Sequence, residues 1–154
     1  MDIELQLTTD TVEQASPNRP LCVEPQASIR EVFALLKDNG AGAVLICHGG
    51  RLAGIFTERD ALHVMQRRDD LDAPIETVMI PAPVVLRSDA SVASAILRMS
   101  SGGYRRLPIV DNKDRPVGIL EVAGIVHYLV EHFPKTIYNL PPVAHPVIHD
   151  REGP

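Results

Sequence analysis

The chain has 154 residues, of which 45% are hydrophobic and 23% are charged. These proportions are typical of a globular protein and allow one compact unit or two small, mutually dependent ones. Aromatic residues make up only 4%, so we expect an aliphatic core. The net charge of −5 argues against a general nucleic-acid binder, because such proteins usually present a basic surface.

Two cysteines and the N-terminal residues bear on the cellular compartment. Cys22 and Cys47 are far apart in the sequence and have no histidine at metal-ligand spacing. We expect both thiols to be reduced core residues of an intracellular protein, without a structural disulfide. The N-terminus has no apolar signal core, and no apolar run approaches the roughly 20 residues that cross a bilayer. These features predict a cytoplasmic protein with no membrane contact.

The first half of the chain reads as a polar arm followed by a compact unit. Residues 1–16 are expected to form a loose N-terminal arm with at most a short ordered segment. The unit at residues 17–70 is predicted to contain a short strand at 21–23, an amphipathic helix capped by Ser28, strands at 43–47 and 52–56, and a helix at about 58–67.

The second half repeats this order. Residues 71–133 begin with an acidic linker and an extended, proline-bounded segment. A short strand at 84–86, a helix capped by Ser91, strands at 107–110 and 117–120, and a helix at about 122–132 are then predicted. Residues 134–154 are proline-rich and are expected to form an extended tail.

The repeat predicts the fold. Gly54 and Gly118 begin equivalent heptapeptides and lie 118 − 54 = 64 residues apart. A repeated unit of this size usually cannot bury its hydrophobic face alone, so it packs against its copy. We therefore predict an α/β fold with α+β character, in which two β-α-β-β-α repeats pack by pseudo-twofold symmetry.

Thr57 and Asp60 lie where a predicted strand becomes a helix. A hydroxyl and free amides at a helix N-terminus favour a phosphate, and a carboxylate one turn later can accept hydrogen bonds from both hydroxyls of a ribose. The structural alternative is that Thr57 caps the helix and Asp60 complements its dipole. The segment alone leaves the two interpretations open.

A family resemblance favours the ligand site. Residues 54–60 read Gly-Ile-Phe-Thr-Glu-Arg-Asp, which matches the glycine–hydrophobic–hydrophobic–Thr/Ser–x–x–Asp signature of CBS domains. Residues 104–111 read Tyr-Arg-Arg-Leu-Pro-Ile-Val-Asp, which is similar to the strand that precedes such a signature. With both halves in register, the chain resembles a tandem CBS pair, or Bateman module, over residues of about 17 to 133.

The resemblance implies a regulatory module that binds AMP, ADP, ATP or S-adenosylmethionine between the repeats, with no cofactor required. Carried over, Thr57 contacts ribose or phosphate, Asp60 contacts ribose and Ile55 packs on the base. Arg59 is a candidate phosphate contact. The opposite repeat is expected to close the cleft with Ala90, Tyr104 and Arg105.

The second copy departs from the family signature. Gly124 stands in place of the ribose carboxylate, and Glu121 puts a negative charge where a phosphate would lie. At about 4 Å such a repulsion is about 1 kcal/mol in water and about 4 kcal/mol at an effective dielectric of 20. We therefore predict one competent site and one degenerate site. Arg105 and Arg106 could still draw an anion to the second cleft; the alternatives are that they are solvated surface residues or pair with Asp111.

The remaining motifs argue against catalysis. No nucleophile with an adjacent base is visible, and neither phosphate-binding glycine motif is present, so we predict that the chain is not an enzyme. His63 and His127 are expected to be partly exposed helix residues without a metal. The chain is expected to form a homodimer through the helices at 58–67 and 122–132 and to signal to a protein target. The alternative is a structural dimerisation module that binds no ligand.

Overall fold

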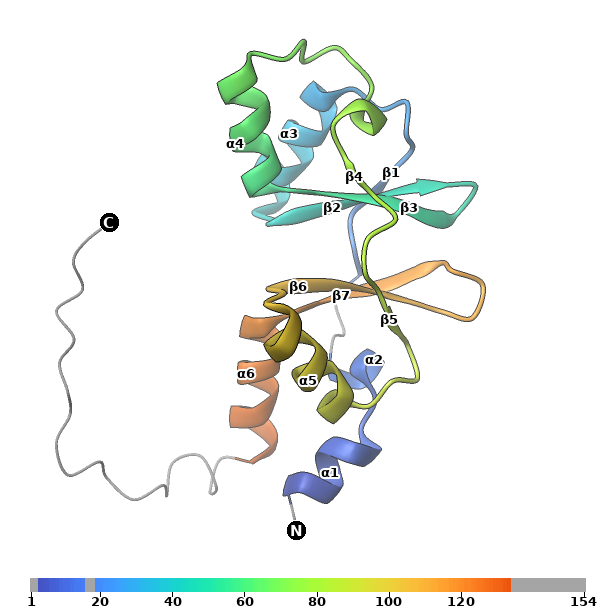
Figure 1. Ribbon diagram of the computed structural model, residues 1–154, viewed down its shortest axis with the longest axis vertical. Helices are drawn as coiled ribbons and strands as arrows, with labels where there is room; N and C mark the ends of the chain where they lie inside the picture. Colours follow the sequence, from blue (N-terminus) through green and yellow to red (C-terminus); the bar gives the residue numbers. More distant parts are fainter. Residues whose placement is uncertain (1–2, 16–18, 134–154) are drawn as a thin grey trace, which may run out of the picture.

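The computed structural model describes residues 3–15 and 19–133, and the predicted C-terminal tail lies outside them. Two small sheets face one another at the centre of the molecule, and the helices cover their outer sides (Figure 1). Each half of the chain supplies one sheet. Within the described residues, no helix is long and apolar enough to span a membrane.

The first repeat forms the upper half of Figure 1. Its elements are β1 (Cys22–Val23), α3 (Ile29–Asn39), β2 (Ala43–His48), β3 (Arg51–Thr57), α4 (Glu58–Arg67), a 3₁₀ turn (Ile75–Thr77) and β4 (Ile80–Pro81). The strand order is β1-β2-β3-β4, with β1 parallel to β2 and the other pairs antiparallel.

The second repeat has the same order of elements. They are β5 (Leu86–Arg87), α5 (Val92–Gly102), β6 (Arg106–Val110), β7 (Pro116–Glu121) and α6 (Val122–His132). The strands lie in the order β5-β6-β7, with β5 parallel to β6 and β7 antiparallel to it. The predicted α/β fold with two β-α-β-β-α repeats is confirmed, and each predicted strand and helix is found within about two residues of its expected bounds.

Local capping signals set the helix ends. The hydroxyl of Ser28 accepts a hydrogen bond from the amide of Glu31 at 3.1 Å, and the Glu31 carboxylate accepts one from the amide of Ser28 at 3.1 Å. This reciprocal pair satisfies two helix amides that would otherwise lack a partner. Gly40 ends α3 in the left-handed conformation at φ 57°, which a residue without a Cβ adopts at low cost. Ser91 caps α5 with its hydroxyl alone, which accepts from the amide of Ser94 at 3.1 Å.

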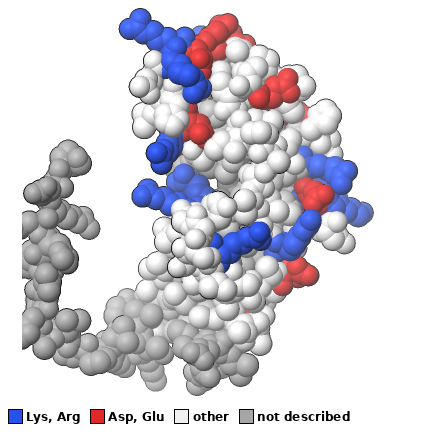
Figure 2. Space-filling view, in the orientation of Figure 1, with Lys and Arg blue, Asp and Glu red and all other residues white. Residues whose placement is uncertain are grey.

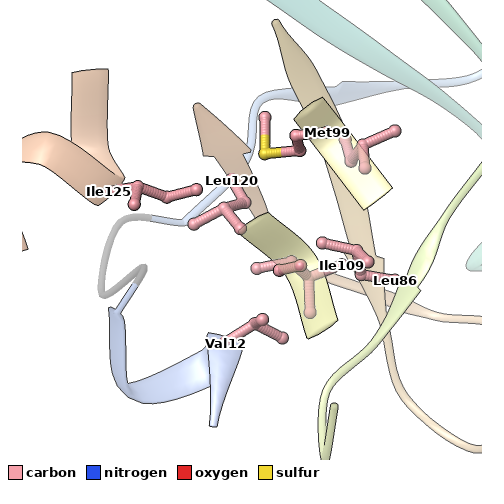
Figure 3. Close-up of a cluster of buried hydrophobic side chains, with 8 residues drawn as sticks. Val12, Leu86, Met99, Ile109, Leu120 and Ile125 are labelled. Atoms are coloured by element: carbon pink, nitrogen blue, oxygen red, sulfur yellow. The ribbon is translucent and has the colours of Figure 1, made fainter. Parts of the chain in front are cut away.

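The expectation of a loose N-terminal arm is wrong for residues 3–15. They form two helices, α1 (Ile3–Thr9) and α2 (Val12–Ala15), that pack on the second repeat. Val12 is fully buried beside Leu86 and Ile109 in the core of that repeat (Figure 3). The Tyr128 hydroxyl also donates a hydrogen bond to Asp10. Burial of the apolar side of a short segment offsets the entropy lost on ordering it.

The segment between the repeats packs on the first repeat, as α1 and α2 pack on the second. The amide of Ile75 donates to the carbonyl of Ala27 at 2.7 Å, and the amide of Val12 donates to the carbonyl of Ala90 at 2.9 Å. The two donors, Val12 and Ile75, are 75 − 12 = 63 residues apart, and the two acceptors, Ala27 and Ala90, are 90 − 27 = 63 residues apart. Ile75 is fully buried in the core of the first repeat. The core of each repeat is therefore completed by the segment that precedes the other repeat.

The sheets meet through a mostly aliphatic layer. Ile119 of the second repeat packs against a buried cluster of the first, formed by Ala43, Leu45, Cys47 and Ile55. At one edge Asp114 joins the two hairpins: its carbonyl accepts from the amide of Leu52 at 2.9 Å, and its Oδ2 lies 3.3 Å from Nη2 of Arg51. This layer fixes the relative position of the repeats.

The cysteines differ from one another, contrary to expectation. Cys47 is buried in the layer between the sheets, but Cys22 is exposed on β1. The expectation that both are core residues is therefore wrong for Cys22. Its strand has only two residues and lies at the edge of the sheet, so one side of it remains open.

Candidate functional site

Thr57 and Asp60 are held together at the junction of β3 and α4. The amide and the hydroxyl of Thr57 both donate to Oδ2 of Asp60 at 2.9 Å, and the amide of Asp60 approaches Oγ1 of Thr57 at 3.4 Å. The predicted capping role is thus present. Both bonds reach the same carboxylate oxygen, and within the described residues Oδ1 of Asp60 has no hydrogen bond. That oxygen is the acceptor that a ribose could use.

The other residues predicted for the first site lie in different environments. Ile55 is buried in the layer between the sheets, and Arg59 is exposed on α4. Tyr104 lies against Gly102 at the end of α5, with 37% of its surface exposed. Arg105 is exposed, and its carbonyl accepts from the amide of Val122. Ala90 packs on the core of the second repeat.

A cleft of about 990 Å³ lies between the repeats. The first repeat contributes residues 39–43 and Glu58, and the second contributes residues 119–121 and one face of α6. The segments 14–15 and 19–21 complete its wall. All three residues predicted for the degenerate second site, Arg106, Glu121 and Gly124, line this cleft, whereas none of the seven predicted for the first site does.

Arg106 crosses from β6 to the first repeat. Its guanidinium lies against Gly42 so closely that a methyl group on Gly42 would overlap it. Nε of Arg106 is 3.7 Å from Oε1 of Glu121, an ion pair too long for a hydrogen bond. That Nε is buried and has no hydrogen-bond partner within the described residues, although 27% of the side chain is exposed. Arg106 is therefore a cation with an unsatisfied donor at the wall of the cleft.

The alternative in which Arg105 or Arg106 pairs with Asp111 is wrong. Asp111 instead accepts from the amides of Lys113 and Arg115 and from Nε of Arg115, the last at 2.9 Å. These bonds, led by that from the Arg115 amide, lower the pKa of Asp111. Asp111 thus stabilises the turn to which it belongs, and Arg106 forms its ion pair with Glu121 instead.

Gly124 and the start of α6 leave space at the other side of the cleft. A Cβ added to Gly124 would meet no atom within 4 Å. Glu121 is the N-cap residue of α6 but makes no capping hydrogen bond with its side chain, unlike Thr57 at α4. The sequence predicted that the ribose carboxylate is lost at this position. In the structure the space next to Gly124 is open, and no other side chain fills it.

The charges around the cleft are mixed. Arg19, Arg106, Glu58, Glu121 and Glu131 line it, together with His127 and His132. His127 pairs with Glu131 at 3.1 Å and is largely exposed, and His63 is exposed as well. Figure 2 shows basic side chains around the waist between the two halves, with acidic ones among them. Within residues 3–15 and 19–133, no three His, Cys, Asp or Glu side chains gather into a metal-binding group.

Sequence reasoning missed Gly42, Glu58 and Arg19 as cleft residues. The pairing of β2 with β3 and of β6 with β7 makes Ala43 and Arg106 equivalent, because they pair with Thr57 and Glu121. Gly42 precedes Ala43, so alignment of the repeats places it at this edge. Its contact with Arg106 had no sequence signal, since the two residues belong to different repeats.

The fold and the paired hairpins define a two-repeat module, and comparison with known proteins identifies it. A model of the CBS domain matches residues 12–67 and 75–131. The chain therefore belongs to the CBS-domain family and carries two such domains in tandem, as its heptapeptides predicted.

Relatives and solved structures agree with this assignment. The CBS domain-containing protein YhcV of Bacillus subtilis is 30% identical over 116 residues, which cover 75% of this chain and 82% of that protein. A CBS domain protein of Pyrobaculum aerophilum complexed with AMP is similar in fold, with a TM-score of 0.70 and 23% identity over 79% of this chain and 99% of that one. The CBS domain pair of protein MJ0100, in complex with 5′-methylthioadenosine and S-adenosyl-L-methionine, has a TM-score of 0.70 and 23% identity over 78% of this chain and 99% of that one.

Proposed function

We propose that this chain is a regulatory CBS pair that binds an adenosyl ligand between its repeats and thereby changes how it engages a protein partner. The observation that carries the proposal is the pair of Thr57 and Asp60, whose side chains the capping bonds hold together at the junction of β3 and α4. A cleft of about 990 Å³ on the side of Arg106 adds support, because it leaves space between the repeats, although neither of these two residues lines it. Cavities of 300 to about 1,000 Å³ are typical of sites for small ligands. Proteins of the same fold hold AMP or S-adenosyl-L-methionine, which names the ligand class.

Thr57 and Asp60 are the proposed ribose and phosphate contacts. The capping bonds hold both side chains in one geometry, and Oδ1 of Asp60 remains to accept from ribose hydroxyls. A hydrogen bond to a charged group contributes about 1.5–3 kcal/mol. Ile55, Arg59, Ala90, Tyr104 and Arg105 complete the proposed first site.

The cleft at Arg106 is the proposed degenerate side. Glu121 repels a phosphate and Gly124 offers no carboxylate to a ribose, so a nucleotide would find only the arginines Arg19 and Arg106 as cationic anchors among the described residues that line the cleft. We assign this side to closing the module around a ligand held elsewhere. A ligand changes the arrangement of the repeats only if it binds one arrangement more tightly than another.

Isothermal calorimetry with AMP, ADP, ATP and S-adenosylmethionine tests the proposal. Wild-type protein should bind at least one of them, and Asp60→Ala should weaken binding by about tenfold or more, since one lost bond of this kind is worth at least about 1.4 kcal/mol. Ser28→Ala is the matched control, because it removes a comparable cap from α3 and lies outside the proposed site.

The same experiment assigns the site. If Arg106→Ala abolishes binding and Asp60→Ala does not, the ligand occupies the Arg106 cleft and the assignment to Thr57 and Asp60 is wrong. If the wild-type protein binds none of the four ligands, the proposed function itself fails. ATP recovered unchanged after incubation would agree with a module that is not an enzyme.

The rival function is a dimerisation module that needs no ligand. Its support is the exposure of apolar side chains on the two predicted dimer helices: Leu62 of α4 is 70% exposed, Met65 is 57% exposed and Val126 of α6 is 55% exposed. Contiguous exposed apolar residues often mark an interface. Gel filtration with and without nucleotide separates the functions, because a pure scaffold should elute at the same dimer volume in both.

A further inference from the structure

The cleft between the repeats follows one face of α6 to the end of that helix. Gly124, His127 and Glu131 are spaced by three and four residues, so they share one helix face, and all three line the cleft. His132, the last residue of α6, lines it as well. The cleft therefore reaches the place where residues 134–154 follow the described part of the chain.

The following segment is long enough to return along this face. Phe133 has non-helical backbone angles, φ −130° and ψ 48°, and the next residue is Pro134, which disfavours a helical conformation of the residue before it. From His132 back to Gly124 the helix measures about 12 Å, at about 1.5 Å per residue. About four extended residues cover that distance, at about 3.3 Å each. The chain has 154 − 133 = 21 residues beyond Phe133, which is far more than the return needs.

The charge of the segment complements that of the cleft. Three carboxylates and two guanidinium groups line the cleft, those of Glu58, Glu121, Glu131, Arg19 and Arg106. Residues 134–149 contain one lysine, Lys135, and no aspartate or glutamate. Glu131 lies in the last turn of α6, where the carbonyl end of the helix disfavours a negative charge. A segment that turns back after the helix brings Lys135 near this carboxylate.

The apolar side chains of the segment also have a surface to cover. Apolar residues from both repeats and from the stretch before β1 line the cleft, including Leu21, Ala41, Ala43, Ile119 and Leu120. By the distances above, Ile137, Tyr138 and Leu140 come level with Gly124 when the chain returns along α6. Pro141 and Pro142 favour an extended chain, which loses less entropy on entering a groove than a flexible one does.

We propose that residues 135–142 dock in the cleft between the repeats of their own chain, antiparallel to α6, and hold the two repeats in one arrangement. Both repeats supply walls of the cleft, so a segment that contacts both walls resists a change in their relative position. Gly124 leaves room for this segment, since the space beside its Cα is open. Docking on this side does not depend on whether Thr57 and Asp60 bind a nucleotide.

Alkylation of a Gly124→Cys thiol in the full chain measures whether the cleft is covered. Without nucleotide, iodoacetamide should modify this thiol about tenfold more slowly than in the same chain carrying Tyr138→Ser and Leu140→Ser. The reason is that the thiol reacts only while the covering segment is undocked. Peptide mapping separates the reporter from Cys22 and Cys47.

Two controls match the experiment. Val147→Ser with Ile148→Ser also replaces two apolar side chains of the tail, but outside the proposed segment, so modification of the reporter should stay slow. Leu97→Cys, at a side chain that is 70% exposed on α5 and outside the cleft lining, should be modified at one rate with either tail.

Hydrogen exchange of the chain without a reporter is the second measurement. The amides of residues 39–43 and of α6 should exchange faster when Tyr138 and Leu140 are replaced by serine, because the docked segment no longer covers them. This difference decides the matter if the cysteine at position 124 itself displaces the segment.

The proposal is overturned if the replacement of Tyr138 and Leu140 changes neither the alkylation rate nor the hydrogen exchange. Protection that is lost on dilution also overturns it, since the covering segment would then belong to a second copy of the chain. An equally large effect of Val147→Ser with Ile148→Ser contradicts the assignment to residues 135–142.

Discussion

Two glycines of the cleft differ in what surrounds them, and this sets how each tolerates a side chain. Gly124 lies in the first turn of α6 with open space around its Cα. We predict that Gly124→Ala stabilises the chain by about 0.5–1 kcal/mol, because glycine loses more backbone entropy in a helix than alanine does. Urea unfolding measures the change in the free energy of unfolding. A destabilised variant would contradict the prediction and show that a methyl group is not tolerated at this position.

Gly42 has the Arg106 guanidinium against it. Gly42→Ala should therefore cost about 1 kcal/mol, the lower end of the range for inserting a methyl group into a packed site. The same substitution in an Arg106→Ala background should cost nothing measurable, since the group that it displaces is gone. A double-mutant cycle by urea unfolding isolates this term, and equal costs in both backgrounds would contradict the contact.

At the scale of elements, the turn between β6 and β7 is held by one carboxylate. Asp111 accepts from the amides of Lys113 and Arg115, and these bonds lower its pKa. Because the pKa in the folded chain lies below that in the unfolded chain, the stabilisation is complete above the unfolded value of about 4 and is lost as the pH falls through the lower folded value.

Asp111→Asn tests this turn. The variant should unfold at lower urea concentration than wild type at pH 7, and the difference should vanish at a pH below the folded pKa, where the wild-type carboxyl is protonated. Arg30 and Asp72 form an exposed pair at 3.0 Å, and Asp72→Asn serves as the control. Exposed pairs contribute little, so this control should unfold close to wild type at pH 7.

At the scale of the whole molecule, the two repeats depend on each other through exchanged segments. Ile75 fills the core of the first repeat, and Val12 fills that of the second. We predict that Ile75→Ala costs about 2–5 kcal/mol, as expected for a fully buried aliphatic residue that leaves a cavity. Val12→Ala should also destabilise the chain, but less, because fewer methyl groups are removed.

Unfolding curves test whether the segments that carry Val12 and Ile75 contribute to the cores of the repeats. Both variants should shift the urea midpoint of a single transition, since each core is joined to the other through the layer between the sheets. Leu97→Ala, at a side chain 70% exposed on α5, should stay within about 0.5 kcal/mol of wild type. A Val12→Ala variant as stable as this control would mean that α2 does not contribute to the core.

Much of the fold was predictable from short-range patterns. Ser28 with Glu31 marks a helix start, Gly40 marks its end, and the period of the apolar residues separates strands from helices. These signals act within a few residues, so they survive without knowledge of the partner surface. The heptapeptides that begin at Gly54 and Gly118 then identified the repeat and its family. The assignment of ligand contacts to Thr57 and Asp60 stays a prediction.

The sequence by itself therefore determined the elements of the two repeats, their duplication and the CBS family, because local hydrogen bonding and hydrophobic periodicity depend on residues that are close in the sequence. Only the tertiary structure decided that Val12 belongs to the core of the second repeat, that Ile75 belongs to the core of the first, and that Arg106 lies over Gly42. Each of these contacts joins positions far apart in the chain. They exist because each core is completed by the segment that precedes the other repeat, and because the two sheets bury a shared aliphatic layer that brings the repeats together.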